Sequence, residues 1–174
     1  DVSDMRHLLE SLGVQVDDLG GNSWRITART VRPADLDPNL CRRIRASILL
    51  AGPMTARAGE LRLSPPGGDV IGRRRLDTHI LALRALGADV SYGRTLEFRA
   101  SGLKGADILM DEASVTATEN AIMAAVRARG ITVIRNAASE PHIQELCRFL
   151  NRLGARIENI GSNTLHIEGV DGLH

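Results

Sequence analysis

The chain has few aromatic side chains and little net charge, and each shortage argues against a class of partner. Only 2% of its 174 residues are aromatic, so few rings are present on which nucleic-acid bases could stack. Basic and acidic side chains nearly cancel and leave a formal net charge of +1, which gives no general attraction to nucleic acid or to an anionic membrane. We therefore expect neither nucleic acid nor a membrane among its partners.

Cysteines and long apolar runs are equally scarce. Cys41 and Cys147 have no CxxC or Cys/His spacing around them, so we expect neither a disulfide framework nor a metal site. Cys147 lies on an apolar stripe with helical spacing and is interpreted as a packed thiol, and Cys41 is interpreted as inert. Every apolar run is far shorter than the roughly 20 residues that cross a bilayer. Length and composition predict one compact cytoplasmic domain.

Internal repetition is what the chain does contain. The pattern L-x-x-L-G-(small) occurs three times, ending at Gly13-Val14, Gly87-Ala88 and Gly154-Ala155. In each copy the two leucines share one helical face, and the glycine supplies the left-handed backbone that ends a helix. Each copy is followed by two short predicted strands separated by turn residues, at 15–16 and 24–28, at 89–91 and 95–100, and at 156–158 and 164–168.

A helix and a strand also precede the second and third copies. Residues 40–57 are predicted to be helical and to lead to a strand at 60–63, and a helix over 115–128 leads to a strand at 131–135. The predicted unit is strand, helix, strand, helix, strand, strand, and the first copy lacks its front half. We therefore expect an α/β fold with a partial repeat over 1–30 and repeats over 31–101 and 102–170.

The loop over residues 64–77, SPPGGDVIGRRRLD, combines a rigid turn, a carboxylate and three arginines. It lies between a predicted strand and a helix for which Asp77 is the predicted N-cap. Free backbone N–H groups at a helix start and neighbouring guanidinium groups favour anions. The loop therefore predicts a cradle for a phosphate or a sugar nucleotide, with a solvated basic turn as the alternative.

A second candidate is the strand-to-helix junction over residues 111–118, DEASVTAT. Its hydroxyl-bearing and small residues can present N–H and O–H donors to phosphate oxygens. The alternative is an ordinary capped helix, with Ser114 or Thr116 as the cap.

These segments resemble one known family. Residues 45–88, RASILLAGPMTARAGELRLSPPGGDVIGRRRLDTHILALRALGA, look like the UDP-N-acetylglucosamine 1-carboxyvinyltransferases, which are enolpyruvyl transferases, and residues 111–118, 132–141 and 163–170 resemble later blocks of that family in order. The resemblance implies two similar domains built as inside-out α/β barrels, with the active site in the cleft between them. The chain would supply one domain over residues 1–170 and the start of the crossover to the other over 171–174. We expect it to begin inside a longer protein.

The family's reaction transfers the enolpyruvyl group of phosphoenolpyruvate to the 3-hydroxyl of UDP-N-acetylglucosamine, releases phosphate and needs no cofactor. It is the first committed step of peptidoglycan synthesis. By resemblance, Asp69 stands at the position of the proton donor, which is usually cysteine, so the antibiotic fosfomycin lacks its thiol target. The resemblance implies the following substrate-binding residues: Arg45, Arg74, Arg75, Leu76, Asp77, Thr78, Glu112, Ala113, Ser114 and Val115.

Three residues depart from the family pattern and keep other functions open. Arg75 replaces a common proline, Glu112 a lysine found in some relatives, and Thr116 a frequent glycine. One alternative is therefore an enolpyruvyl transferase with another acceptor, either a different nucleotide or shikimate 3-phosphate. Another is a sugar-nucleotide-binding module without catalysis. We expect the chain alone to be inactive without a second domain, and to self-associate through the edge that its incomplete first unit leaves unpaired.

Overall fold

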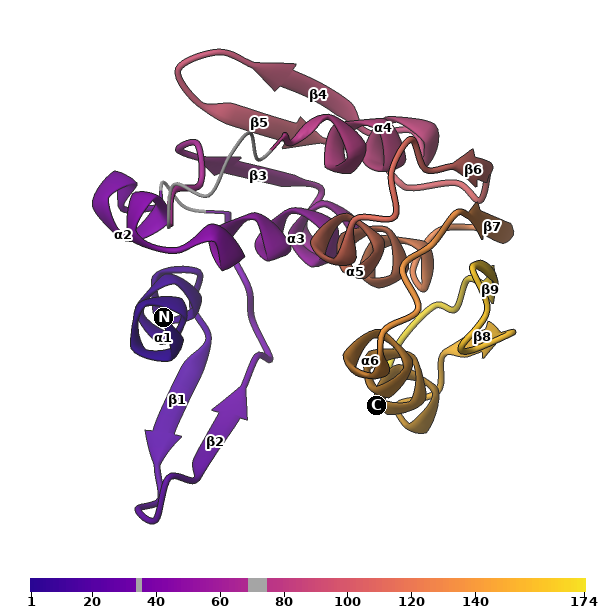
Figure 1. Cartoon of the computed structure of the whole chain (residues 1–174). Helices are drawn as coiled ribbons and strands as arrows, with labels where there is room; N and C mark the ends of the chain where they lie inside the picture. The colour runs from indigo at the N-terminus through magenta and orange to yellow at the C-terminus, as the bar shows by residue number, and fades with distance from the viewer. Residues whose placement is uncertain (34–35, 69–74) are drawn as a thin grey trace.

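Helices occupy the middle of the molecule and β-sheets lie on its outer sides (Figure 1). The computed structural model describes residues 1–33, 36–68 and 75–174, and these residues form a two-stranded, a three-stranded and a four-stranded sheet. No helix among the described residues has both the length and the apolar character that a bilayer crossing requires.

The N-terminal region is a helix followed by a hairpin. Helix α1 (Val2–Ser11) leads to antiparallel strands β1 (Gln15–Asp18) and β2 (Trp24–Thr27). Gly13 follows the helix with φ of 90°, the left-handed conformation expected from the L-x-x-L-G pattern.

The middle region adds a group of short helices and a three-stranded antiparallel sheet with the order β3-β5-β4. In chain order its elements are α2 (Pro38–Arg43), the 3₁₀ helix η1 (Arg45–Leu50), α3 (Ala51–Ala58), β3 (Glu60–Leu63), α4 (Asp77–Ala85), β4 (Asp89–Tyr92) and β5 (Leu96–Arg99).

The single helix predicted over residues 40–57 is wrong. Ile44 has an extended backbone, with φ of −129° and ψ of 134°, and separates α2 from η1. The buried hydroxyl of Ser47 donates to the carbonyl oxygens of Cys41 and Ile44, so it takes bonds that backbone amides would make in a continuous helix. The opening strand expected for the unit over 31–101 is also missing from the described residues of that segment.

The C-terminal region follows the expected element order. It contains β6 (Asp107–Leu109), α5 (Val115–Ala125), β7 (Ile131–Arg135), α6 (Pro141–Arg152), β8 (Arg156–Glu158) and β9 (Thr164–Glu168). Its sheet has the order β6-β7-β9-β8, with β6 and β7 parallel and the other pairs antiparallel.

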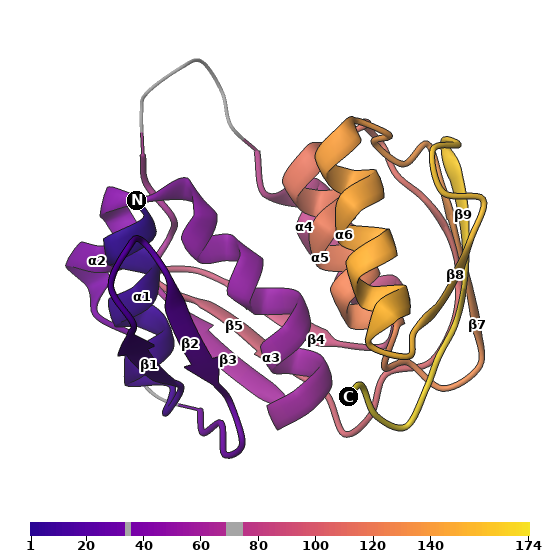
Figure 2. The ribbon, with the colours of Figure 1, turned by 90° about the horizontal axis from the view of Figure 1, so that it is seen from below.

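Helix α5 is the centre of the packing. It contacts α3, α4 and α6, and Figure 1 shows α5 between α4 and α6, with α6 crossing in front of α5 in the view from below in Figure 2. Its buried face is rich in alanine, which lets neighbouring helices approach closely. Cys41 and Cys147 are both fully buried, and burial raises the pKa of each thiol, that of Cys147 to about 11. The interpretation of both as packed, unreactive thiols is consistent with this burial.

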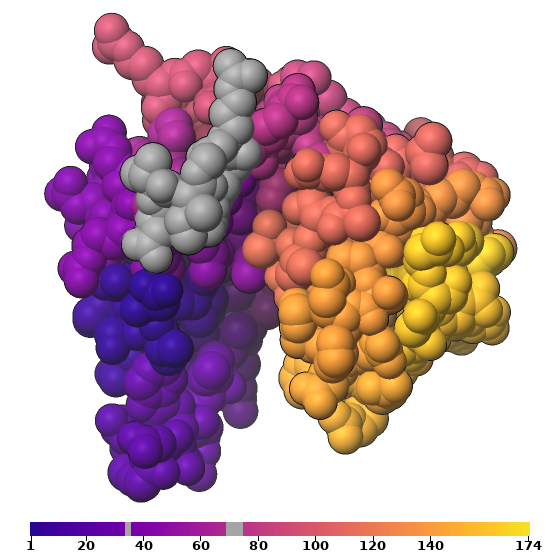
Figure 3. Space-filling view, in the orientation of Figure 1, coloured from indigo at the N-terminus to yellow at the C-terminus, as the bar shows by residue number. Residues whose placement is uncertain are grey.

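A cleft separates the N-terminal hairpin from α6 (Figure 3). Most of the side chains that line it are apolar, and they include Ala28, Pro53, Met123, Leu150 and Leu173.

Candidate functional site

The arginine-rich loop is anchored at its base. Asp69 and Arg74, the proposed acid and one proposed phosphate contact, lie outside the described residues. Before them, the amide of Gly67 donates to the Cys41 carbonyl at 3.1 Å and the amide of Gly68 donates to the Arg42 carbonyl at 3.0 Å. A Cβ on Gly67 would lie 1.7 Å from the Arg42 carbonyl oxygen, so no other residue fits there. The glycine pair therefore holds the chain that follows β3 against the last turn of α2.

The loop returns at the start of α4, where the sequence prediction needs a correction. The helix begins at Asp77, and Leu76 occupies the N-cap position without a side-chain cap, so Asp77 is not the N-cap. Its carboxylate pairs with the guanidinium of Arg75 at 2.6 Å and raises the pKa of that group. Asp77 still lies in the first turn, where a negative charge interacts favourably with the helix dipole.

Arg45 connects η1 to the same place. Its Nη2 donates to the carbonyl oxygen of Arg75 at 2.8 Å across 30 residues of sequence. The structure thus brings together the predicted site residues Arg45, at the start of η1, and Arg75, just before α4. Leu76 beside them is buried and packs in the core.

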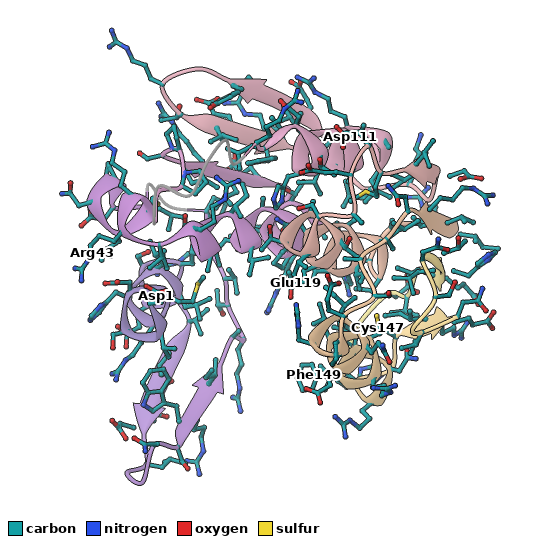
Figure 4. The ribbon with its side chains drawn as sticks, viewed as in Figure 1. Asp1, Arg43, Asp111, Glu119, Cys147 and Phe149 are labelled. Carbon is teal, nitrogen blue, oxygen red and sulfur yellow. The ribbon has the colours of Figure 1, made fainter. Side chains whose placement is uncertain are left out.

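Thr78 joins α4 to the second candidate segment. Its buried hydroxyl donates to Asp111 at 2.6 Å, and Glu112 lies at 3.4 Å from the same oxygen. Figure 4 labels Asp111 beside α4, although the two residues are 33 positions apart. This bond holds the start of α4, directly after the described end of the arginine-rich loop, against the second candidate segment.

Helix α5 begins directly after this contact. Ser114 holds the N-cap position, as one of the two expected caps, but its side chain makes no capping bond, and Thr116 lies inside the helix. The carbonyl of Ser114 accepts from the Thr118 hydroxyl at 2.8 Å, and that hydroxyl accepts from the Ala138 amide at 3.1 Å. The predicted site residues beside Ser114 are exposed or half-buried, namely Glu112, Ala113 and Val115.

Sequence reasoning missed two buried polar residues behind these segments, His79 and Asn120. His79 and Asn120 are almost completely buried, and their side chains lie 2.9 Å apart. The other ring nitrogen of His79 lies 3.2 Å from the hydroxyl of Thr116. Burial first, and the charge of Arg45 second, lower the pKa of His79 to about 4, so the ring is neutral near pH 7. The sequence contains one clue to this buried pair, because Asn120 is a single asparagine among the alanines of α5.

The chemistry of these segments suits anion binding of a selective kind. Besides its partner Asp77, Arg75 lies close enough to Asp111 and Glu112 for both charges to raise the pKa of its guanidinium, and Arg45 bonds to the Arg75 carbonyl oxygen. The first backbone N–H groups of α5, which starts just after Glu112, have no helical partner. Asp77, Asp111 and Glu112 offset part of this positive charge. In the part of the chain that the structure describes, no three His, Cys, Asp or Glu side chains come together as a metal site.

A family model described as EPSP synthase (3-phosphoshikimate 1-carboxyvinyltransferase) matches residues 1–174. Curated relatives share high identity over nearly the whole chain. A protein of Bradyrhizobium diazoefficiens named UDP-N-acetylglucosamine 1-carboxyvinyltransferase is 60% identical over 97% of the chain and 39% of its own length. Proteins of the same name from Treponema denticola and Bacteroides fragilis are 54% and 48% identical over the full chain. The chain spans about two fifths of these relatives.

Solved structures match in fold. The enolpyruvyl transferase NikO from Streptomyces tendae superposes with a TM-score of 0.80 at 19% identity, covering 97% of this chain and 40% of that one. An EPSP synthase from Acinetobacter baumannii gives a TM-score of 0.72 at 19% identity, covering 98% and 39%.

Proposed function

Because the chain belongs to the EPSP synthase family, we propose that it forms one wall of the active site of a UDP-N-acetylglucosamine 1-carboxyvinyltransferase. Such an enzyme transfers the enolpyruvyl group of phosphoenolpyruvate to the sugar 3-hydroxyl in peptidoglycan synthesis. The observation that carries the proposal is the joining of both sequence motifs by the Arg45–Arg75 and Thr78–Asp111 hydrogen bonds. Curated relatives with that name share up to 60% identity, which supports this acceptor.

The finer architecture is part of the proposal. We assign a partial repeat to residues 1–30, repeats to 31–101 and 102–170, and the start of a crossover to 171–174, within an inside-out α/β barrel. Matching strand orders β3-β5-β4 and β7-β9-β8 support the repeats, and the central helices with outer sheets support the barrel. The remaining length of the relatives would supply a second domain and the other wall of the cleft.

Each binding residue has a proposed part in holding the substrates. Arg45 contacts the sugar nucleotide, Arg74 lies near the reacting phosphates, and the segment from Arg75 to Thr78 lines the uridine side. The backbone of Ala113, Ser114 and Val115 lies beside the diphosphate. Glu112 points its carboxylate to Thr78, which keeps that charge at the α4 side and leaves the amides at the start of α5 for phosphate oxygens.

Asp69 is the proposed acid. Its carboxyl proton passes to the methylene carbon of phosphoenolpyruvate while the sugar oxygen bonds to the adjacent carbon and gives up its own proton to a base. Loss of phosphate, with loss of a proton from the new methyl group, then restores the double bond. A carboxyl group can hold its proton for this step if loop closure removes water and raises its pKa.

Activity of the full protein tests this function directly. Phosphate release from phosphoenolpyruvate should require UDP-N-acetylglucosamine, and Asp69→Asn should lower it by about 10²-fold or more because the general acid is lost. Glu112 favours testing shikimate 3-phosphate and other nucleotide sugars in parallel. Turnover only with one of those acceptors would contradict the proposal. Binding of UDP-N-acetylglucosamine without turnover would identify a non-catalytic module.

Fosfomycin distinguishes the acid at position 69. A carboxylate is a poor nucleophile toward the epoxide, so the enzyme should keep its activity during incubation with fosfomycin. Asp69→Cys should become sensitive and gain a covalent adduct, measured by intact mass. Rapid inactivation of the unsubstituted protein with an adduct on Asp69 would disprove the assignment.

We also propose that the chain by itself is inactive and associates with copies of itself. Leu19 and Ile26 of the N-terminal hairpin region are 54% and 57% exposed, and the apolar cleft beside α6 is open. Exposed apolar surface of this kind favours association. Sedimentation over a range of chain concentrations measures it, and a monomer at every concentration would count against this part.

A further inference from the structure

A buried polar cluster lies where four helical elements meet behind the candidate site. His79 is 1% exposed and Asn120 is 0% exposed, among side chains that are mostly aliphatic. Burying such groups is unfavourable unless every polar atom finds a partner. The bonds of this pair therefore decide whether it stabilises a particular arrangement of the helices.

Each polar atom of Asn120 is used. Its amide nitrogen lies 2.8 Å from the Ile48 carbonyl and 2.9 Å from His79 Nδ1, and its amide oxygen accepts from the Gly52 amide at 2.7 Å. An amide nitrogen only donates, so His79 Nδ1 must accept and the ring proton is assigned to Nε2. That proton is donated to Thr116, which completes the network.

The network lies where α3 and α5 approach closely. A Cβ added to Gly52 of α3 would lie 2.4 Å from the backbone oxygen of Asn120 on α5. Only glycine leaves room for the Asn120 side chain to bond with the backbone of both η1 and α3. The burial of His79, which makes its ring neutral, fits this role, because a charged ring could not accept from Asn120.

Three of the bonded groups are close in sequence to a candidate binding residue. His79 follows Thr78 in α4, Thr116 follows Val115 in α5, and Ile48 lies one 3₁₀ turn after Arg45. Small and aliphatic side chains alone allow neighbouring helices to slide, whereas hydrogen bonds with fixed partners set the register.

We propose that His79 and Asn120 are positioning residues that hold the binding segments at Arg45, at Arg75 to Thr78 and at Glu112 to Val115 in register before the sugar nucleotide binds. The inference rests on the proposed function for its ligand. A preorganised surface loses less free energy on binding, and a displacement of about 1 Å in such a site can cost roughly 10²-fold.

The test compares four variants of the full protein. His79→Leu removes both ring hydrogen bonds. His79→Asn keeps an amide oxygen near the place of Nδ1 and so retains an acceptor for Asn120. Thr116→Val removes only the partner of Nε2. The control, Leu165→Ala, opens a cavity under β9, away from the site.

Calorimetry measures the dissociation constant for UDP-N-acetylglucosamine. NMR measures the chemical shifts of the backbone amides in the three segments and of the ring nitrogens of His79. His79→Leu should raise the dissociation constant by about 10- to 100-fold and change the chemical shifts of those amides. His79→Asn should recover part of the affinity. Leu165→Ala should lower the unfolding midpoint while leaving the affinity and the amide chemical shifts of the three segments unchanged.

Several outcomes would overturn the inference. One is that His79→Leu leaves the amide chemical shifts of the three segments unchanged, and another is a ring proton on Nδ1 in the unsubstituted protein. Equal affinities of His79→Leu and Leu165→Ala for the sugar nucleotide would also overturn it. If His79→Leu does not fold, the amide chemical shifts of Thr116→Val are compared with those of the unsubstituted protein, and unchanged shifts would overturn the inference. If the unsubstituted protein does not bind UDP-N-acetylglucosamine, the proposed function fails. The amide chemical shifts of the variants then show whether His79 and Asn120 position these segments.

Discussion

Helix α5 is held by two different kinds of contact along its length. At its start, Thr116 and Asn120 make hydrogen bonds to α4, and Asn120 also bonds to η1 and α3. Farther along, alanines and Ile122 pack in the apolar core beside α6 and β9. Apolar packing provides most of the stability but is non-directional, so it is compatible with many relative positions of the helices. The hydrogen bonds of the polar junction are directional and are formed in only one of these positions. The candidate site lies over the polar junction.

Among the substitutions that test this contrast between the two parts of α5, the largest loss of stability is expected at Gly52. Gly52→Ala places a methyl group against the Asn120 backbone and forces α3 and α5 apart, which should cost about 3 kcal/mol of unfolding free energy. Denaturant unfolding measures the loss, and calorimetry should show weaker sugar-nucleotide binding because the junction moves. Unchanged stability and affinity would mean that the two helices can separate freely. Gly87→Ala is a control for adding a methyl group at a glycine with open space, although its φ of 94° adds backbone strain of its own.

A somewhat smaller effect is expected from acid. His79 has a pKa of about 4 in the folded protein against an ordinary value of 6.5, so the unfolded chain binds more protons between these values. The stability due to the neutral ring is therefore complete above pH 6.5 and is lost as the pH falls toward 4, by about 2–3 kcal/mol. Denaturant unfolding at pH 7 and pH 4.5 measures it.

The control for this prediction is His79→Asn, which has no titrating ring. Acidic groups elsewhere contribute equally to both proteins, so the difference between their pH slopes isolates His79. Parallel slopes would contradict a buried neutral ring.

The smallest effect is expected in the apolar region and has the opposite sign. Thr132 in β7 is fully buried, and its hydroxyl has no hydrogen-bond partner among the described residues. Thr132→Val keeps the shape and removes this unpaired group, so it should stabilise the protein by about 1 kcal/mol. Thermal unfolding measures the change, with unaltered binding. A destabilised variant would reveal a partner for that hydroxyl and weaken the contrast with Asn120.

Much of the local structure was predictable. The three L-x-x-L-G patterns each end a helix before a hairpin, and the strands at 131–135, 156–158 and 164–168 have the predicted bounds. These features depend on periodicity and on one glycine conformation, which neighbouring residues set. The break at Ile44 was not predictable, because the carbonyl groups before it are bonded by the buried Ser47 hydroxyl and by the amides of Gly67 and Gly68, which are distant in sequence.

Some residues of the candidate site were likewise predictable from the sequence and others were not. Arg45, Arg75, Thr78 and Glu112 were identified from the sequence, and the structure places them together. Asp77 was assigned the wrong local role: the helix begins at this residue, one position earlier than expected, and its carboxylate pairs with Arg75. His79 was missed because its partner Asn120 is 41 residues away.

The sequence by itself determined the kind of elements, the repeated helix-and-hairpin pattern and the family, because these depend on spacing and on residue types along the chain. Only the tertiary structure decided that the start of α4 contacts the second candidate segment and that a neutral His79 lies behind this contact. Burial and hydrogen-bond partners depend on segments that are distant in sequence, and it is their packing around α5 that sets the pKa of the ring and the register of the site.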